Sequence, residues 1–215
     1  GGNLIVQNGG SLIMGCGANP QIDMTCVDDS SGNATAIVQG NLEAPGALGV
    51  VVHNATIGGD VVESGGGGGY NCNSSTVSPA FGFGVYSDYE SSSIGGNLRV
   101  TGVTSCWFGA LRLQVGGSAT FANNTFADPD ASENLTNTIA GNLLCSGNSP
   151  QVEYGDSEGS PNVVGGYATG ECAFSVTQPN PAPSGPPPAT GGPLAPISTP
   201  STTLHGYWLA AADGG

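Results

Sequence analysis

Residues 94–100 read Ile-Gly-Gly-Asn-Leu-Arg-Val, the clearest copy of a phrase that recurs along the chain. After the glycine pair, apolar Leu98 and Val100 alternate with charged Arg99, which is the pattern of a β-strand with one buried face. Six further stretches repeat the phrase: 1–4 (GGNL), 39–42 (QGNL), 58–61 (GGDV), 116–119 (GGSA), 140–143 (AGNL) and 165–168 (GGYA). Seven copies predict a repeat architecture.

The spacing of the phrase predicts the size of one repeat. Its second glycine stands at positions 2, 40, 59, 96, 117, 141 and 166, giving steps of 38, 19, 37, 21, 24 and 25 residues. Two steps are close to twice 19, so we expect a further coil inside each of them, and about eight or nine coils in all. Coils of this length suit an all-β, right-handed parallel β-helix (β-solenoid) over residues 1–175, with strands of successive coils paired about 4.8 Å apart.

The alternation also predicts which side chains fill the interior. We expect Ile57, Val61, Ile94, Val115, Ala119, Phe121, Ile139, Leu143, Cys145, Val164 and Ala168 to point inward. We expect Glu43, Thr120 and Thr169 to point outward. The glycine pair is expected at a corner, where Gly supplies either positive φ or close backbone approach. Stacked corners would align the next residues in a polar ladder (Asn3, Asn41, Asp60, Asn97, Ser118 and Asn142), unless these are simply exposed turn residues.

Composition limits the classes of partner. The chain has 38 Gly and 15 Pro among 215 residues, which disfavours a conventional globule. Its net charge is −14, with only two Lys or Arg residues, so nucleic acid and anionic membrane surfaces are poor partners. The sequence has no initiator Met, no basic n-region and no apolar run of about 18 residues, so neither a signal peptide nor a membrane span is expected.

Six cysteines without any CxxC pair predict three disulfides rather than a metal or redox motif. Coils of a solenoid contact only adjacent coils, so we expect pairs between sequence neighbours: Cys16 with Cys26, Cys72 with Cys106, and Cys145 with Cys172. Disulfides indicate an oxidising compartment, and we expect an extracellular or cell-surface protein. Asn-x-Ser/Thr sequons permit N-glycans at Asn33, Asn54, Asn73, Asn123 and Asn134.

The final coils read NLLCSGN at 142–148 and VGGYATGEC at 164–172. These phrases resemble those of actinobacterial secreted proteins built from repeated I/V-G-G-N-L/V coils. The resemblance covers roughly residues 1–172 and implies a fold more than a role. A looser resemblance, in coil length and Gly-Asp/Asn-Val phrasing, is to bactofilins, which are polymer-forming cytoskeletal β-helices. The cysteines and the acidity argue against a cytosolic setting.

Residues 176–203 are Pro-rich and predict an extended linker. Residues 204–215 are apolar and aromatic, with Leu204, Tyr207, Trp208 and Leu209 as candidate subunit-docking residues. The phrase at 206–215 resembles the first half of a G-Y-W-L-x-x-x-D-G-G-I-F repeat, so this segment is either a docking strand or the start of a further domain. Residue 1 already lies inside a repeat phrase, and the end of a solenoid exposes unpaired strand edges. Such edges pair with strands of another chain, so a homo-oligomer or homopolymer is expected.

These features favour an extracellular structural protein, a self-assembling surface or filament subunit, over an enzyme. The alternative is a carbohydrate-binding or carbohydrate-cleaving surface protein. A sugar-cleaving site would need clustered carboxylates together with Arg or Lys. Asp28 and Asp29 are the one adjacent acidic pair, and the approximate one-coil spacing of Arg99 and Arg112 would place these two on one face. Trp107, Phe108, Tyr86 and Tyr89 would form a sugar platform, or else pack over a disulfide or at a subunit contact.

No cofactor is expected, apart from weak Ca²⁺ binding by loop carboxylates. The candidates are Asp128, Asp130, Asp156 and Glu158. His53 and His205 show no metal-ligand spacing, so structural roles are expected for both.

Overall fold

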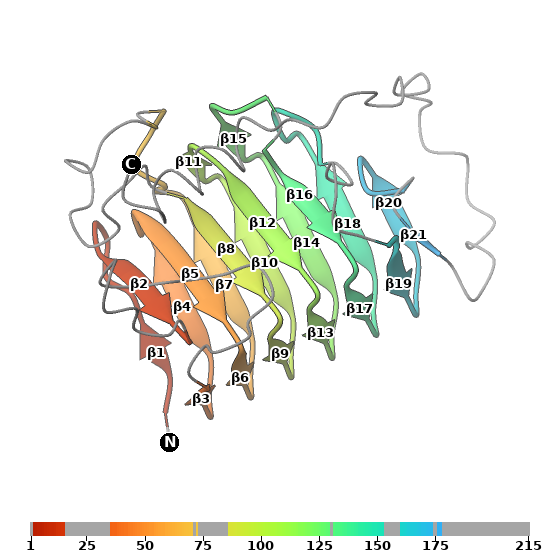
Figure 1. Cartoon of the computed structure of the whole chain (residues 1–215), viewed down its shortest axis with the longest axis horizontal. Helices are drawn as coiled ribbons and strands as arrows, with labels where there is room; N and C mark the ends of the chain where they lie inside the picture. Colours follow the sequence, from red (N-terminus) through yellow and green to blue (C-terminus); the bar gives the residue numbers. More distant parts are fainter. Residues whose placement is uncertain are drawn as a thin grey trace, which may run out of the picture.

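The structure, a computed structural model, describes residues 2–15, 35–70, 72, 86–129, 131–152, 160–173 and 176–177. Within these residues every regular element is a β-strand, and every strand pairing is parallel (Figure 1). The all-β parallel fold predicted from the repeat is therefore confirmed. The last paired strand lies just past the predicted boundary at residue 175.

Three long sheets contain most of the strands. Sheet A holds β1 (Leu4–Ile5), β4 (Leu42–Pro45), β7 (Val61–Ser64), β10 (Leu98–Thr101), β14 (Ala119–Ala122), β18 (Leu143–Ser146) and β20 (Ala168–Gly170). Sheet B holds β2 (Ser11–Met14), β5 (Gly49–His53), β8 (Ser87–Glu90), β12 (Phe108–Leu111) and β16 (Glu133–Leu135). Sheet C holds β3 (Ala36–Val38), β6 (Ala55–Ile57), β9 (Ser93–Ile94), β13 (Gln114–Val115), β17 (Thr138–Ile139), β19 (Asn162–Val164) and β21 (Val176–Thr177). A small fourth sheet pairs β11 (Thr104–Ser105) with β15 (Thr125–Phe126).

In the first five coils the chain passes through sheets A, B and C in turn and returns to sheet A one strand further along, so that successive coils stack (Figure 1). The described part of the last two coils contributes strands to sheets A and C only. In sheet A, Leu42 pairs with Leu4, and Leu98 pairs with Val61. The steps of 38 and 37 residues are therefore single coils, and the prediction of a hidden coil in each is wrong. Sheet A has seven strands, one per coil. The additional residues fall between β2 and β3 and between β7 and β8.

The predicted inward residues are buried, except that Ala168 in the last strand of sheet A is only partly buried. Glu43 and Thr120 are more exposed than their neighbours along the strands, as predicted, whereas Thr169 in the last strand of sheet A is half-buried like Ala168. Aromatic rings fill the middle coils. The Phe108 ring lies 5.3 Å from that of Phe121 and 5.8 Å from that of Phe126.

The glycine pairs form the corner between sheets C and A, and close approach is the reason for glycine there. None of the pairs at 58–59, 95–96 and 116–117 has positive φ. A Cβ at Gly95 would overlap the carbonyl oxygen of Gly58, and a Cβ at Gly96 would overlap Oδ1 of Asp60. Each coil therefore lies directly against the corner of the coil before it.

Left-handed backbone occurs at the other two corners. After sheet A it falls mostly on glycine, as at Gly102 (φ 67°), but once on Asn123 (φ 56°). After sheet B it falls on Gly15 in the first coil and on residues with side chains in the later coils, which are Asn54, Ser91, Arg112 and Thr136. Their N–H groups bond to the next coil, as from Ser91 to the Leu111 carbonyl at 3.0 Å. These coil-to-coil hydrogen bonds offset the cost of the conformation.

The polar column predicted beside the glycine pairs exists. Each side-chain oxygen accepts the backbone N–H of the equivalent residue in the next coil, as from Asn97 to Asp60 at 2.7 Å and from Ser118 to Asn97 at 2.9 Å. The same contact joins each step from Asn3 to Tyr167. This exposed ladder provides acceptors for corner N–H groups that lie outside the strand pairings.

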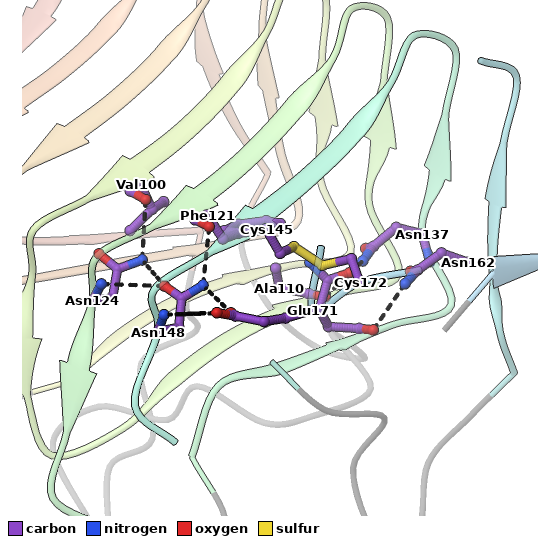
Figure 2. The surroundings of a disulfide bond; sticks show 11 residues. Val100, Ala110, Phe121, Asn124, Asn137, Cys145, Asn148, Asn162, Glu171 and Cys172 are labelled. Atoms are coloured by element: carbon purple, nitrogen blue, oxygen red, sulfur yellow. Dashed lines mark hydrogen bonds between the residues drawn. A yellow bond between two sulfur atoms is a disulfide. The ribbon is translucent and has the colours of Figure 1, made fainter. Parts of the chain in front are cut away.

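Two buried asparagine ladders run in the opposite direction (Figure 2). Asn148 Oδ1 accepts the N–H of Asn124 in the preceding coil at 3.2 Å, and Asn162 Oδ1 accepts that of Asn137 at 3.0 Å. Their side-chain amides also donate to buried carbonyls, as from Asn148 to Phe121 at 3.0 Å. The interior thus combines apolar packing with hydrogen-bonded asparagines.

Replacing Gly96 with Ala should destabilise the protein, because the new Cβ has no room against Asp60 and the Gly59 backbone. We expect a loss of about 1–3 kcal/mol in the free energy of unfolding, measured by urea denaturation. The matched control is Gly2→Ala in the first coil, where a Cβ meets nothing within 4 Å. Equal losses in the two variants would contradict the close-approach account.

Candidate functional site

Sheet B is buried on both faces, unlike sheets A and C. All described residues of β5, β8, β12 and β16 are buried, including those that point away from the interior. On the outer face, the Trp107 ring lies over Gly109, where a Cβ would overlap it. The Tyr86 ring meets Trp107 edge-on at 6.4 Å. Charged residues on this face are therefore held in a low-dielectric setting.

Three ionisable side chains meet on this outer face. His53 ends β5, and Asp88 and Glu90 lie on β8, where spacing by two residues puts both on one face. His53 pairs directly with Glu90 in the strand register. Its Nε2 lies 2.6 Å from Asp88 Oδ2, and its Nδ1 lies 3.6 Å from Glu90 Oε2. The side chains are only 2%, 4% and 1% exposed.

Arg112 completes the group from the left-handed corner after β12. Its guanidinium forms an ion pair with Glu90 Oε1, and its Nε donates to Ser91 Oγ at 3.3 Å. The Arg112 side chain remains 27% exposed. Two buried carboxylates thus share one arginine and one histidine. Removing one partner would leave a buried charge uncompensated, which strongly destabilises a fold.

Four atoms of this cluster have no hydrogen bond among the described residues, and two of them, Glu90 Oε1 and an Arg112 terminal nitrogen, form the ion pair with each other. The other two are His53 Nδ1 and Asp88 Oδ1. One ligand atom each from His53, Asp88 and Glu90 lies within 4.8 Å of the others, and this is the one such group among the described residues. The set can hold a cation. It is not an open catalytic cleft, since its acids are almost fully buried.

A further buried acid, Glu63, lies inside the solenoid. Ser87 Oγ donates to its Oε1 at 2.6 Å, and Tyr89 OH donates to its Oε2 at 2.7 Å. Burial raises the pKa of Glu63 to about 7, although the two hydrogen bonds lower it in part. The pKa of Tyr89 is also raised well above its usual value, first by burial and then by the neighbouring charge of Glu63.

Two of the three predicted disulfides are confirmed. Cys72 bonds to Cys106 with a Cα–Cα distance of 5.2 Å, and Cys145 bonds to Cys172 with a distance of 5.4 Å. The second bridge lies in the interior beside the asparagine ladder (Figure 2). Cys16 and Cys26 lie outside the described residues.

The sequons differ in accessibility. Asn123 is exposed and Asn54 is half-buried, so both remain predicted glycan sites. Asn134 is unsuitable, because its side chain is fully buried and accepts a hydrogen bond from Asn137 at 3.0 Å. Asn33 and Asn73 lie outside the described residues.

The other predicted sites are mostly untested. Asp128 is half-buried and remains a candidate calcium ligand, whereas its predicted companions fall outside the described residues: Asp130, Asp156 and Glu158. The docking residues of the tail also fall outside them: Leu204, Tyr207, Trp208 and Leu209.

Two expectations for a sugar site are wrong. Arg99 and Arg112 do not share a face, because Arg99 is exposed on sheet A whereas Arg112 follows β12 of sheet B. The predicted aromatic platform is buried, with Trp107 only 5% exposed and Tyr86, Tyr89 and Phe108 less so. These rings pack against one another within the protein, as Tyr86 does on Trp107 and Tyr89 on Phe108.

The His53 cluster was missed because its members are 35 residues apart in sequence and meet only through strand register across an insertion. The spacing of Asp88 and Glu90 was the one available signal. Comparison with protein-family models, curated proteins and solved structures finds no match for this chain. No helix in the described part of the chain is long and apolar enough to cross a membrane.

The raised pKa of Glu63 makes stability depend on pH. The folded state holds this proton more tightly than the unfolded chain, whose pKa is near 4.5. The contribution is therefore complete below about pH 4.5 and is lost as pH rises through about 7. Between pH 4.5 and 8, the stability of the protein relative to Glu63→Gln should fall by about 3 kcal/mol in urea titrations. Glu43→Gln on the outer face is the control, and a Glu63→Gln difference that stays constant with pH would refute this account.

Arg112→Ala should leave Glu90 buried without its cationic partner. We expect a loss of about 2 kcal/mol in the free energy of unfolding, less than for a fully buried pair because Arg112 is partly exposed. The chain's other arginine supplies the control: Arg99→Ala on the exposed face should change stability by less than about 0.5 kcal/mol. Similar effects in thermal or urea unfolding would show that the ion pair contributes little.

Proposed function

We propose that the protein is an extracellular structural protein, a rod of right-handed coils that self-assembles into a surface layer or filament. The observation that carries this proposal is the incomplete burial of the first coil. Its inward side chains Leu4 and Leu12 are only partly buried, whereas their counterparts Leu42 and Val50 in the next coil are fully buried. Among the strands that the structure describes, each strand of this coil has a partner on one side only.

Two further features support the proposal. Parallel strands joined by a crossover are right-handed in about 98% of cases, which favours that hand for the coils. Two disulfides, one of them joining the last coils, fit an oxidising extracellular setting. Continuous ladders and buried aromatic packing make the coils a rigid unit suited to bearing load rather than to opening around a substrate.

The free edge offers hydrogen-bonding groups to a second copy. In β1, the N–H groups of Leu4 and Val6 bond to the β4 side, so by alternation that of Ile5 faces the free edge. In β3, the Val38 carbonyl accepts from Gly58, which leaves the Ile37 N–H facing the free edge. A second copy of the chain is the occupant we propose, since its own coils present the matching parallel strand.

Replacing Ile5 and Ile37 together with proline removes both edge donors while leaving the bonds to β4 and β6 in place. Assembly should then need about a tenfold higher protein concentration, or more, followed by light scattering and negative-stain electron microscopy. The control is the double Ile5→Thr, Ile37→Thr variant, which also reduces apolar surface but keeps both N–H groups. Circular dichroism checks that all three proteins are folded.

A native protein that stays monomeric over the whole concentration series would contradict the proposal, including the case in which other residues of a longer chain cover this edge. The alternative of a carbohydrate-binding or carbohydrate-cleaving protein is separated by a glycan array and a reducing-sugar assay on the monomer. A structural subunit should give neither binding nor product.

A further inference from the structure

We propose that His53 and Glu90 bind a divalent transition-metal cation of the Zn²⁺ type on the outer face of sheet B, with Asp88 and Arg112 holding the two ligands in position. The site does not depend on the proposed assembly. It arises from four side chains on three successive strands or corners of sheet B.

The distance between the two ligand atoms fits a shared metal. His53 Nδ1 and Glu90 Oε2 are 3.6 Å apart, too far for a hydrogen bond. Two ligands that each lie about 2.1 Å from a tetrahedral Zn²⁺ are separated by about 3.4 Å. A cation placed between these atoms would therefore need only a small adjustment of either side chain.

The histidine is oriented as a ligand. Its Nε2 lies 2.6 Å from Asp88 Oδ2, so a proton on Nε2 is donated to the carboxylate. The lone pair of Nδ1 then faces Glu90, and this buried nitrogen has no hydrogen-bond partner among the described residues. A carboxylate that fixes the far nitrogen of a metal-binding imidazole is the usual outer-shell arrangement.

The glutamate is oriented in the same way. Arg112 forms an ion pair with Glu90 Oε1, which leaves Oε2 toward the imidazole. Asp88 and Glu90 carry two negative charges against one from Arg112, so the cluster with neutral His53 attracts a cation. Asp88 stays at the opposite ring nitrogen as a positioning residue, so water completes the coordination.

The donor set selects the class of metal. Imidazole nitrogen with carboxylate oxygen suits Zn²⁺ and its neighbours, whereas Ca²⁺ takes six to eight oxygen ligands. The site would also join β5 to β8, two neighbouring strands of sheet B. In the sequence these strands are separated by the insertion between β7 and β8. Bound metal would thus hold adjacent coils together at that point.

The test uses the full chain, stripped with EDTA and titrated with Zn²⁺ alone by calorimetry. We expect one Zn²⁺ per chain, with His53→Gln and Glu90→Gln weakening binding at least about tenfold and Asp88→Asn by about 10- to 100-fold. His205→Gln, which removes the only other histidine, is the matched control and should bind as the native protein does. Saturating Zn²⁺ should raise the melting temperature by about 5 °C or more.

Zinc X-ray absorption of the His205→Gln protein keeps the proposal falsifiable if the cluster variants do not fold. A first shell with one imidazole nitrogen supports it, because His53 is the only histidine left. A shell of oxygen alone overturns it. So does a native protein without Zn²⁺-dependent heat or stabilisation, the result expected if His53 is simply protonated between the two carboxylates.

Discussion

Close stacking of one coil on the next is the constraint on which the structure depends. Parallel strands pair only when their backbones lie about 4.8 Å apart along the whole coil, corners included. At the corner between sheets C and A, even one methyl group would overlap the preceding coil, as at Gly95 and Gly96. Glycine is therefore needed there for space rather than for φ, and the apolar side chains of adjacent coils meet because the corners permit it.

Side-chain oxygens continue the hydrogen bonding where the strands stop. The exposed ladder through Asn97 accepts N–H groups from the following coil, while the buried ladders through Asn124 and Asn137 offer their N–H groups to it. Together they provide acceptors for corner N–H groups in both directions along the axis. This explains how a chain so rich in glycine, and with so few charges, holds a defined interior.

Sheet B differs from the other two because both of its faces are buried. Buried charge needs partners, and here His53, Asp88, Glu90 and Arg112 supply them to one another across strands. The interior Glu63 differs, since its pKa, raised by burial to about 7, leaves the acid partly protonated near neutral pH. The same low-dielectric setting thus produces an ion cluster on one side of the sheet and a titrating acid on the other.

The amino-acid pattern alone determined the all-β fold, the buried face of the strands, the glycine corners and two disulfide pairings, because each depends on local periodicity or on contact between adjacent coils. It left the polar column open against simple exposed turn residues, and the hydrogen bonds between coils decided in favour of the column. It misjudged the number of coils, because insertions that lengthen a coil look like additional coils in sequence. Only the tertiary structure decided which residues adopt left-handed backbone after sheet B, and that His53 meets Asp88 and Glu90. Those outcomes depend on register across a long insertion, and no local spacing in the sequence encodes that register.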